Sequence, residues 1–411
     1  MRGWQQVPLS ELVTEAKPGF ACGEEDVDGV FQIRMNNVTR GGRLDLSKRR
    51  RVPASHKGVA GALLQEGDVL FNATNSPDLV GKTVLIENID EPTVFSNHFL
   101  RLKVRSGELD PGYLARWLNY QFQRGVYKAM CRQWVNQATL GREPLMRTSV
   151  PLQPIELQRR VAEVLDRVDA LREKRRKSIA LLDDLTQSIF LDMFGDPVTN
   201  SRGWPRRAVG DIGKVTTGNT PSRSIDQNYG DAIEWIKSDN IDPSRVVLTP
   251  ASERLSKDGM KTARIVGPGS LLVTCIAGSP GSIGNSAIAD RPVAFNQQIN
   301  ALTPYDASPA FLLMLLRVGK RLVQSASTGG MKGLVSKSRF ESIDLIYPPL
   351  GKQHEFASKF DSLEQMRQAL RRSCAELDAL FSSLQSRAFR GELWHDKAKE
   401  LAGEEAYEQW E

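Results

Sequence analysis

The sequence predicts an α+β protein built from two copies of one unit, each a β-rich domain followed by a long helix. Three observations predict this fold. The chain of 411 residues resembles itself after a shift of about 200 residues. Each copy begins with short apolar runs that Gly, Pro, Asn and Ser interrupt, as in strands joined by turns. Each copy ends in a segment in which apolar residues recur every three or four positions, as on one face of a helix.

The apolar runs give the positions of individual elements. We expect strands at residues 63–64, 69–71, 84–86, 265–266 and 271–273. We expect shorter helices near residues 112–130 and 310–325.

The repeat is visible throughout the two copies. Gly3-Trp4 recurs as Gly203-Trp204, and Asn97-His98-Phe99 corresponds to Gln297-Gln298-Ile299. The agreement is clearest at the long segments, where a constant offset of 195 aligns the first copy with the second without gaps. The aligned pairs are Pro154 with Pro349, Gln158 with Gln353, Ala162 with Ala357, Asp166 with Asp361, Arg172 with Arg367, Leu182 with Leu377, Leu185 with Leu380 and Phe194 with Phe389.

The two long segments predict helices that need a helical partner, because no Pro or Gly interrupts residues 155–194 or 352–390. At 1.5 Å per residue each helix would be a rod of roughly 57 Å. We favour antiparallel pairing of the two helices as a coiled coil, which would place the β-rich domains at opposite ends of the rod. Dimerisation through each helix separately is the alternative. The apolar positions expected to bind a partner are Val161, Leu165, Val168, Leu182, Leu185, Phe356, Phe360, Leu363, Leu377 and Leu380.

These patterns divide the chain into six parts. They are a first β-rich domain at 1–148, long helix 1 at 149–195, a linker at 196–202, a second β-rich domain at 203–346, long helix 2 at 347–394, and an acidic tail at 395–411.

Composition excludes several classes of protein. No apolar run approaches the 18 residues of a membrane-spanning helix, and no signal peptide is visible. The four cysteines are far apart and form no CxxC motif, which argues against a zinc site or a disulfide framework and fits a reducing cytoplasm. The net charge is +6, but the last 22 residues carry −4, so the rest of the chain carries +10 and suits a polyanionic partner.

Catalytic motifs are not found in the sequence. Gly81-Lys82-Thr83 looks like the end of a P-loop, but Ser76 stands where the motif needs its first glycine, so we interpret it as a turn with a surface lysine. Tyr347-Pro348-Pro349 lacks the Asn or Asp of a methyltransferase loop, and we interpret it as the stop before the long helix. We therefore predict no catalytic residues, no metal site and no cofactor in this chain.

The polar loops of both domains suit duplex DNA. Arg and Lys bind phosphates or guanine, Asn and Gln pair with adenine, and small polar residues contact phosphates. The DNA-binding candidates are Arg34, Asn36, Asn37, Arg40, Arg43, Asn72, Asn75, Lys82, Asn97, His98, Arg132, Gln133, Asn136, Gln137, Thr217, Asn219, Thr220, Ser222, Arg223, Lys237, Ser238, Asn240, Asn296, Gln297, Gln298, Lys332 and Lys337.

The duplication adds a mechanism to this interpretation. Two reading domains joined by a rod could bind two half-sites with an unread spacer between them, since half-sites on one face of DNA lie about 34–36 Å apart. Because the loops of the two copies differ, the half-sites should differ in sequence.

Several segments of the second copy carry a family resemblance. They are Gly203-Trp204, Val209-Gly210-Asp211-Ile212-Gly213, Thr217-Gly218-Asn219-Thr220-Pro221-Ser222, Glu234-Trp235-Ile236-Lys237-Ser238-Asp239-Asn240-Ile241, Asn296-Gln297-Gln298 and Pro348-Pro349-Leu350-Gly351-Lys352-Gln353. With the duplication, they make essentially the whole chain resemble the specificity (S) subunit of a type I restriction-modification enzyme. The first copy departs from the pattern, with Gln153-Pro154-Ile155-Glu156-Leu157-Gln158 at its helix start and Lys17-Pro18-Gly19-Phe20 in place of the Asn-Thr-Pro-Ser loop.

The resemblance implies a concrete function. Such subunits have two target-recognition domains and a coiled-coil spacer, and they read an asymmetric bipartite DNA sequence. They recruit two methyltransferase (M) subunits, which methylate adenine with S-adenosylmethionine, and restriction (R) subunits, which use ATP and Mg. The S subunit itself is non-catalytic, and the long helices with their flanks would bind the M subunits.

Two other functions remain open from the sequence. An enzyme such as a nuclease with a diverged site would act on DNA without partners. A scaffold that only pairs two β-rich modules would bind without sensitivity to salt or DNA sequence. The acidic tail has no role that the sequence assigns.

Overall fold

The structure, a computed structural model, describes residues 4–133, 137–328 and 333–393. The chain forms two compact units, which we call unit 1 (residues 1–174 and 373–411) and unit 2 (residues 175–372). Each long helix therefore contributes residues to both units, and neither unit ends at a predicted domain boundary.

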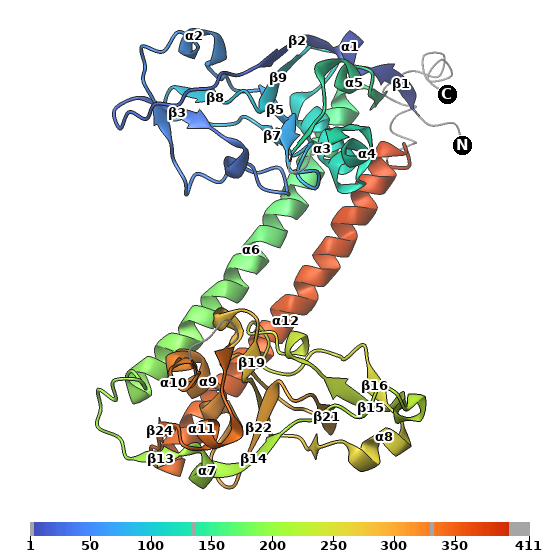
Figure 1. The fold of residues 1–411 in the computed structure, drawn as a ribbon. Helices are drawn as coiled ribbons and strands as arrows, with labels where there is room; N and C mark the ends of the chain where they lie inside the picture. The colour runs from blue at the N-terminus through green and yellow to red at the C-terminus, as the bar shows by residue number, and fades with distance from the viewer. Residues whose placement is uncertain (1–3, 134–136, 329–332, 394–411) are drawn as a thin grey trace. The chain divides into compact units, whose positions relative to one another are not determined.

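In the described part of the chain, unit 1 contains four small sheets and five short helices. Figure 1 shows the ribbon. The strands are β1 (Gln5–Pro8), β2 (Val13–Pro18), β3 (Val30–Ile33), β4 (Arg51–Val52), β5 (Val69–Asn72), β6 (Thr74–Asn75), β7 (Thr83–Leu85), β8 (Thr93–Phe95), β9 (Phe99–Val104), β10 (Arg132–Gln133), β11 (Ala138–Thr139) and β12 (Ser149–Leu152). The short helices are α1 (Leu9–Leu12), α2 (Val59–Ala62), α3 (Pro111–Gln123), α4 (Val126–Met130) and α5 (Arg142–Met146).

Unit 2 repeats this series. Its strands are β13 (Arg206–Ala208), β14 (Gly213–Thr217), β15 (Tyr229–Ile236), β16 (Arg254–Leu255), β17 (Ile265–Val266), β18 (Leu271–Thr274), β19 (Ile276–Ala277), β20 (Ser286–Ile288), β21 (Val293–Phe295), β22 (Ile299–Pro304), β23 (Gly333–Leu334) and β24 (Asp344–Ile346). Its short helices are α7 (Val209–Ile212), α8 (Lys257–Thr262), α9 (Pro309–Val318), α10 (Lys320–Ser325) and α11 (Lys337–Glu341).

The strand pairings confirm the internal repeat. Unit 1 has the four-stranded sheet β2-β9-β5-β7, and unit 2 has β14-β22-β18-β20. Sheet β4-β3-β8 corresponds to β16-β15-β21-β17, and the pair β1-β12 corresponds to β13-β24. The same fold has thus formed twice from sequences that differ at most positions.

Sheet β2-β9-β5-β7 of unit 1 and sheet β14-β22-β18-β20 of unit 2 each separate two apolar cores. In unit 1, Val69 and Phe71 face the core that holds α3, whereas Leu70 faces the core beneath β3 and β8. In unit 2, Leu271 faces the core that holds α9, and Leu272 faces the core on the other side of the sheet. A strand that is buried on both faces needs apolar residues in succession, which is why these predicted strands are continuous runs.

The other predicted short elements are partly correct. Strands 69–71, 84–86, 265–266 and 271–273 coincide with β5, β7, β17 and β18 to within a residue or two. The strand at 63–64 was a wrong prediction: only one backbone hydrogen bond, from Leu64 N to Thr93 O (2.9 Å), joins this segment to β8. Each predicted shorter helix is two helices, with breaks at Gly125 (φ +74°) and Gly319.

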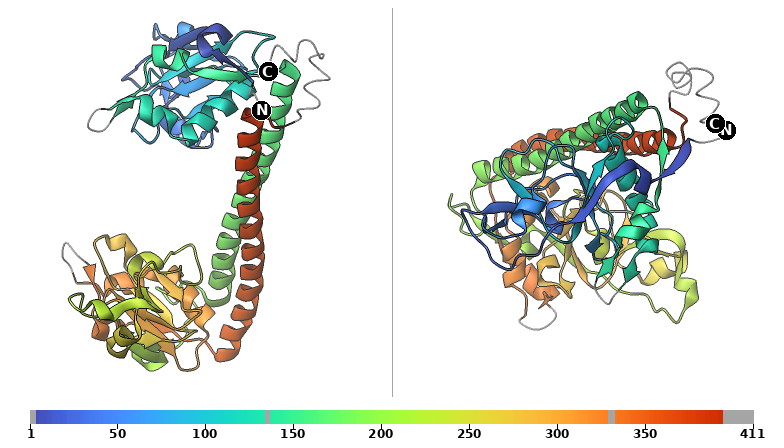
Figure 2. Two further views of the ribbon diagram at one scale, coloured as in Figure 1. Left: turned by 90° about the vertical axis from the view of Figure 1, so that its right-hand side faces the viewer. Right: turned by 90° about the horizontal axis from the view of Figure 1, so that it is seen from above.

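The two long helices are α6 (Ile155–Phe194) and α12 (Leu350–Phe389), of 40 residues each. Pro154 precedes α6 and Pro349 precedes α12. Each helix ends near a glycine with positive φ, which is Gly195 (+74°) for α6 and Gly391 (+79°) for α12. Figures 1 and 2 show the two helices side by side within each unit.

The helices pair in an antiparallel sense within each unit, as predicted. In unit 1 the first half of α6 meets the last half of α12, where Arg172 Nε donates to Asp378 Oδ1 (2.6 Å). In unit 2 the last half of α6 meets the first half of α12, where Arg367 Nε lies 2.9 Å from Asp183 Oδ1. No helix among the described residues combines the length and apolar character that crossing a membrane requires.

Candidate nucleic-acid interface

A pair of parallel strands gives each unit one polar edge. In unit 1, β3 runs parallel to β8 with Ile33 opposite Phe95. In unit 2, β15 runs parallel to β21 with Ile236 opposite Phe295. Because parallel strands have their carboxyl ends at the same side of the sheet, the segments that follow them lie together. We call these segments edge 1 (residues 34–36 and 96–98) and edge 2 (residues 237–239 and 296–298).

Edge 1 presents a basic surface. The Arg34 side chain is exposed and has no ion-pair partner within the described parts of the chain. Partial burial and the nearby charge of Arg34 lower the pKa of His98 below its usual value, so the imidazole is neutral at pH 7. Asn36 and Asn97 are exposed beside them. The edge therefore offers one free guanidinium among neutral polar groups.

The hairpin of β10 and β11 adds further polar groups to unit 1. Arg132 and Gln133 are exposed and pair with Thr139 and Ala138. Strand β11 in turn pairs with β6, and the backbone N–H of Ala73, just before β6, donates to His98 O (2.9 Å). Backbone hydrogen bonds therefore link the hairpin to edge 1.

Edge 2 differs from edge 1 in its charge. Lys237 occupies the position of Arg34, but its ammonium binds the Glu253 carboxylate and lies 5.2 Å from the centre of the Trp235 ring. Glu253 also binds Arg223 Nη2 (2.8 Å). The carboxylate therefore pairs with two of the cations predicted to bind DNA, and the three groups together keep a net charge of +1.

The glutamine amides of edge 2 are held by hydrogen bonds. Thr220 Oγ1 donates to Gln297 Oε1. Gln298 Oε1 accepts from Asn296 Nδ2 (3.0 Å) and from Ser238 Oγ (3.3 Å). Gln297 is exposed, so its amide N–H groups face solvent from a fixed position.

Twelve of the predicted DNA-binding residues are exposed and could reach DNA. They are Arg34, Asn36, Arg40, Asn97, Arg132, Gln133, Gln137, Thr220, Ser222, Arg223, Gln297 and Lys337. Asn136, Lys332 and the acidic tail at 395–411 lie outside the described residues.

Lys82 has a structural role, so both of its predicted roles, as a surface lysine and as a DNA ligand, were wrong. Its side chain is 5% exposed, and Nζ donates to Met35 O (2.8 Å) and Val38 O (2.5 Å). Burial, with a smaller contribution from the charge of Arg40, lowers the Lys82 pKa. The lysine fixes the loop that follows β3, because it satisfies carbonyl groups that would otherwise lack donors.

Several predicted asparagines also shape the backbone. Asn37 Oδ1 accepts from Arg34 N (2.9 Å), and Asn240 Oδ1 accepts from Lys237 N (3.0 Å) in the equivalent turn. Asn219 binds Thr262 O and Arg264 N. Asparagines that are buried or bound in the same manner are Asn72, Asn75 and Asn296.

Arg43 joins the first domain to its long helix. Its Nε and Nη2 atoms donate to Asp169 Oδ2 of α6 at 2.9 and 2.8 Å. Arg116 and Arg172 approach the same carboxylate at 3.5 and 2.9 Å. Because Asp169 is 4% exposed, this cluster is part of the protein interior, and Arg43 is removed from the DNA-binding set.

Most of the apolar helix positions predicted to bind a partner are covered by their own unit. Val161 and Leu165 pack into the core of unit 1, and Phe356 and Phe360 into that of unit 2. In contrast, the side chains of Leu185 and Leu380 are 45% and 46% exposed. The buried positions of α6 and α12 pack together in each unit, for example Val161 and Leu165 with Phe381 and Phe389, whereas the exposed positions are free to contact another subunit.

Glu253, Tyr229 and Trp235 are site residues that the sequence did not reveal. Arg223 lies over the Tyr229 and Trp235 rings at 5.1 and 5.5 Å from their centres. Glu253 is far from both cations along the chain, and no motif marks it. The Glu234-Trp235-Ile236-Lys237 sequence could have indicated a ring beside the lysine.

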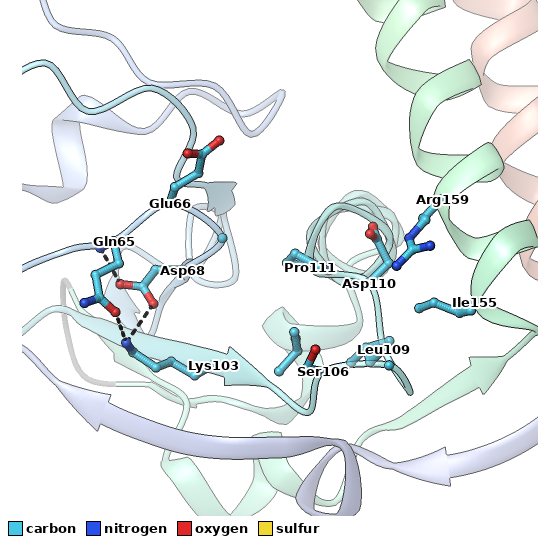
Figure 3. A pocket seen from close by; sticks show the side chains of 13 residues that line it. Gln65, Glu66, Asp68, Lys103, Ser106, Leu109, Asp110, Pro111, Ile155 and Arg159 are labelled. Carbon is cyan, nitrogen blue, oxygen red and sulfur yellow. Dashed lines mark hydrogen bonds and ion pairs between the residues drawn. The ribbon is translucent and has the colours of Figure 1, made fainter.

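A polar pocket of about 310 Å³ in unit 1 lies apart from these residues (Figure 3). Lys103 Nζ donates to Gln65 Oε1 (2.7 Å) and lies 3.6 Å from Asp68 Oδ1. The equivalent place in unit 2 holds a hydrogen bond between Ser270 and Thr303 (2.7 Å). None of the predicted DNA-binding residues lines the pocket. Across the described ranges, no cluster of three or more His, Cys, Asp or Glu could hold a metal ion.

A family model matches the second copy. Residues 201–376 match the model described as the type I restriction modification DNA specificity domain. The specificity domain includes edge 2 and Glu253, and the first copy has the same sheet order.

Relatives extend the similarity beyond the specificity domain. The putative type I restriction enzyme MjaX specificity subunit of Methanocaldococcus jannaschii is 19% identical, over 95% of this chain and 93% of its own length. The HindI specificity subunit of Haemophilus influenzae is 32% identical over 36% of this chain and 32% of its own. These similarities confirm the predicted resemblance to type I specificity subunits.

A solved structure supports the fold. The S subunit of a type I restriction-modification system from M. genitalium aligns with a TM-score of 0.60 at 13% identity, over 94% of this chain and 96% of its own. The similarity covers both β-rich domains and both long helices, which agrees with the predicted α+β architecture.

Proposed function

We propose that this chain is the DNA-recognition subunit of a type I restriction-modification complex and that it reads an asymmetric bipartite target, one half-site with each unit. One observation carries the proposal. Each unit places a polar edge at the carboxyl ends of one parallel strand pair, and the two edges differ in charge and hydrogen-bonding groups. Equivalent positions with different chemistry are what two readers of different sequences require.

The long helices would set the spacer between the half-sites. Both helices contribute to both units, so a change in their length should change the number of unread base pairs. The two M subunits would contact helix side chains that the units leave exposed, such as Leu181 (65%), Leu185 (45%) and Met366 (56%). Apolar side chains of this size in exposed positions suit a protein partner.

The chain would act without catalysis of its own. The partner subunits would supply S-adenosylmethionine-dependent methylation and, where R subunits are present, ATP- and Mg-dependent translocation and cleavage. The role of this chain would be to position the DNA target relative to the partner subunits.

The test is the methylation pattern of the host. Single-molecule sequencing should show adenine methylation at one asymmetric bipartite motif, which disappears when this gene is deleted. Exchanging residues 1–148 for those of another specificity subunit should change one half-site and leave the other and the spacer unchanged. A change in both half-sites would show that the units are not independent readers.

Salt dependence separates this proposal from a scaffold role. The affinity of the complex for its target should fall steeply as salt rises, because Lys and Arg displace counterions from phosphates. Binding that ignores salt and DNA sequence would favour a scaffold. Cleavage or methylation by the purified chain without partners would favour an enzyme.

A further inference from the structure

We infer that Arg34 reads a guanine in the half-site of unit 1 and that Gln297 reads an adenine in the half-site of unit 2. The inference rests on the proposed function and names the base contacts of its two edges. It follows from which hydrogen-bonding groups each edge leaves available after its internal bonds are made.

The guanidinium of Arg34 is available and its backbone is fixed. Arg34 N donates to Asn37 Oδ1 (2.9 Å), and Arg34 O accepts from Asn37 N (2.8 Å). The Asn37 amide in turn donates to Asp45 O and Lys48 O. The turn therefore holds the Cα atom of Arg34, while the exposed side chain has no carboxylate partner in the described residues.

Guanine is the base that such a side chain recognises. Two parallel N–H groups of arginine match the O6 and N7 acceptors of guanine in the major groove. His98, the neighbour of Arg34 at edge 1, is neutral at pH 7, so it adds no competing charge. The only other exposed polar side chains at this edge are the amides of Asn36 and Asn97.

The corresponding cation of unit 2 is not available. Glu253 binds both Lys237 and Arg223, and Trp235 lies beneath both cations. Edge 2 therefore lacks the free cation that edge 1 presents. Its exposed hydrogen-bonding side chains are the Gln297 amide and the Asp239 carboxylate, and only the amide offers both a donor and an acceptor.

The bonding of Gln297 matches adenine. Its Oε1 atom accepts one hydrogen bond, from Thr220, which leaves one lone pair and both N–H groups. The free N–H can donate to N7 of adenine, and the free lone pair can accept from its N6 amino group. Gln298 cannot bind in this way, because Asn296 and Ser238 already occupy both lone pairs of its Oε1 atom.

The experiment uses the complete methyltransferase complex, formed by the full chain and its M subunits. The wild-type recognition sequence is first determined by methylome sequencing. Binding is then measured for Arg34→Gln and Gln297→Met on duplexes in which each base pair of the target is changed in turn. Matched controls are Arg147→Gln and Gln227→Met, which alter exposed residues of the same units outside the edges and outside the set of DNA-binding candidates.

Arg34→Gln should reduce discrimination at one guanine of one half-site by about 5- to 150-fold, and Gln297→Met should do so at one adenine of the other half-site. The controls should leave discrimination at these positions unchanged. Thermal unfolding that matches the wild type shows that the variants fold.

Two results would overturn the inference. If a variant complex keeps full discrimination at every position, or loses it at a base of another kind or in the wrong half-site, the assignment is wrong while the proposed function stands. If the wild-type complex shows no sequence preference at all, the proposed function fails together with the inference.

Discussion

Arg172 of α6 donates from Nε to the Asp378 carboxylate of α12 at 2.6 Å. The repeat reproduces this contact with the helices exchanged, since Arg367 of α12 lies 2.9 Å from Asp183 of α6. Both pairs are related by the same offset of 195 residues. The surroundings differ: Phe381 lies under the Arg172 guanidinium at 4.3 Å, whereas the equivalent Thr186 accepts a hydrogen bond from Arg367 (3.1 Å).

Arg367→Met should lower the free energy of unfolding by about 1–3 kcal/mol, because it leaves the partly buried Glu364 without its cation. The Arg367 side chain is 4% exposed, so solvent cannot replace its contacts. Urea unfolding of the full chain measures the change. Arg372→Met, at an exposed position of the same helix, should change stability by less than about 0.5 kcal/mol. Equal effects of the two variants would contradict the assigned role.

Gln353→Met should destabilise unit 2 by a similar amount, about 1–3 kcal/mol. The fully buried Gln353 accepts from Ser308 N (3.1 Å) and donates to Pro348 O (2.9 Å), so it joins α9 to the start of α12. Gln158 makes the equivalent bonds to Asp110 N and Gln153 O in unit 1. Calorimetry of Gln353→Met, Gln158→Met and the double variant should show nearly additive losses of stability, because each substitution acts in its own unit.

The stability of unit 1 should fall as the pH is lowered through the normal pKa of His98. The folded-state pKa of His98 is below its usual 6.5, because burial and Arg34 disfavour the imidazolium. As the pH falls, the unfolded chain therefore binds the proton first. Stability is lost between the usual His pKa of the unfolded chain and the lower pKa of His98 in the folded state. His98→Gln should remove this part of the pH dependence in denaturant titrations from pH 7.5 to 5. An unchanged pH profile would show that His98 does not contribute.

Glu253→Gln should strengthen binding to non-specific DNA and make it more dependent on salt. The Lys237 side chain, with its direct hydrogen bond, is the main cause of the lowered pKa of Glu253, so the carboxylate is ionised, pairs with both Lys237 and Arg223, and offsets one of their two positive charges. Releasing one or two cations should steepen the slope of log K against log salt by about 0.9 for each additional phosphate that the protein neutralises. Filter binding or anisotropy at several salt concentrations measures this slope. Glu173→Gln, which alters a partly exposed acid in α6, serves as the control.

Removing seven residues from each long helix should shorten the unread spacer and keep both half-sites. Seven residues are two turns of a paired helix, so the apolar faces stay in register. Methylome sequencing of a strain with this variant measures the spacer directly. An unchanged spacer with altered half-sites would contradict the role of the helices as a ruler.

The long helices and the repeat could be predicted because their signals extend over many residues. One apolar position in every three or four, continued across 40 residues without Pro or Gly, leaves few alternatives to a helix. The constant offset between the two long segments also predicted that Arg172 and Arg367 are equivalent residues. Short strands were less predictable, as residues 63–64 show, because one backbone hydrogen bond decides their assignment.

The site was only partly predictable, since polar residues in loops serve structure and binding alike. Lys82 and Arg34 look equivalent in the sequence, yet one is buried against two carbonyl groups of the loop after β3 and the other is exposed. The acceptors of Lys82 are 47 and 44 residues away along the chain. Which lysine or asparagine is already bound depends on such distant contacts, and a single sequence does not show them.

The division of the chain also has a consequence for the order of events at the ribosome. Phe381, Ala388 and Phe389 belong to the core that the first domain forms with α3 and α6. That core therefore lacks these side chains until nearly the whole chain has been synthesised, whereas every residue of unit 2 precedes position 373. The domain that is translated first is the one whose core is completed last, so its exposed apolar face needs protection from aggregation for most of translation.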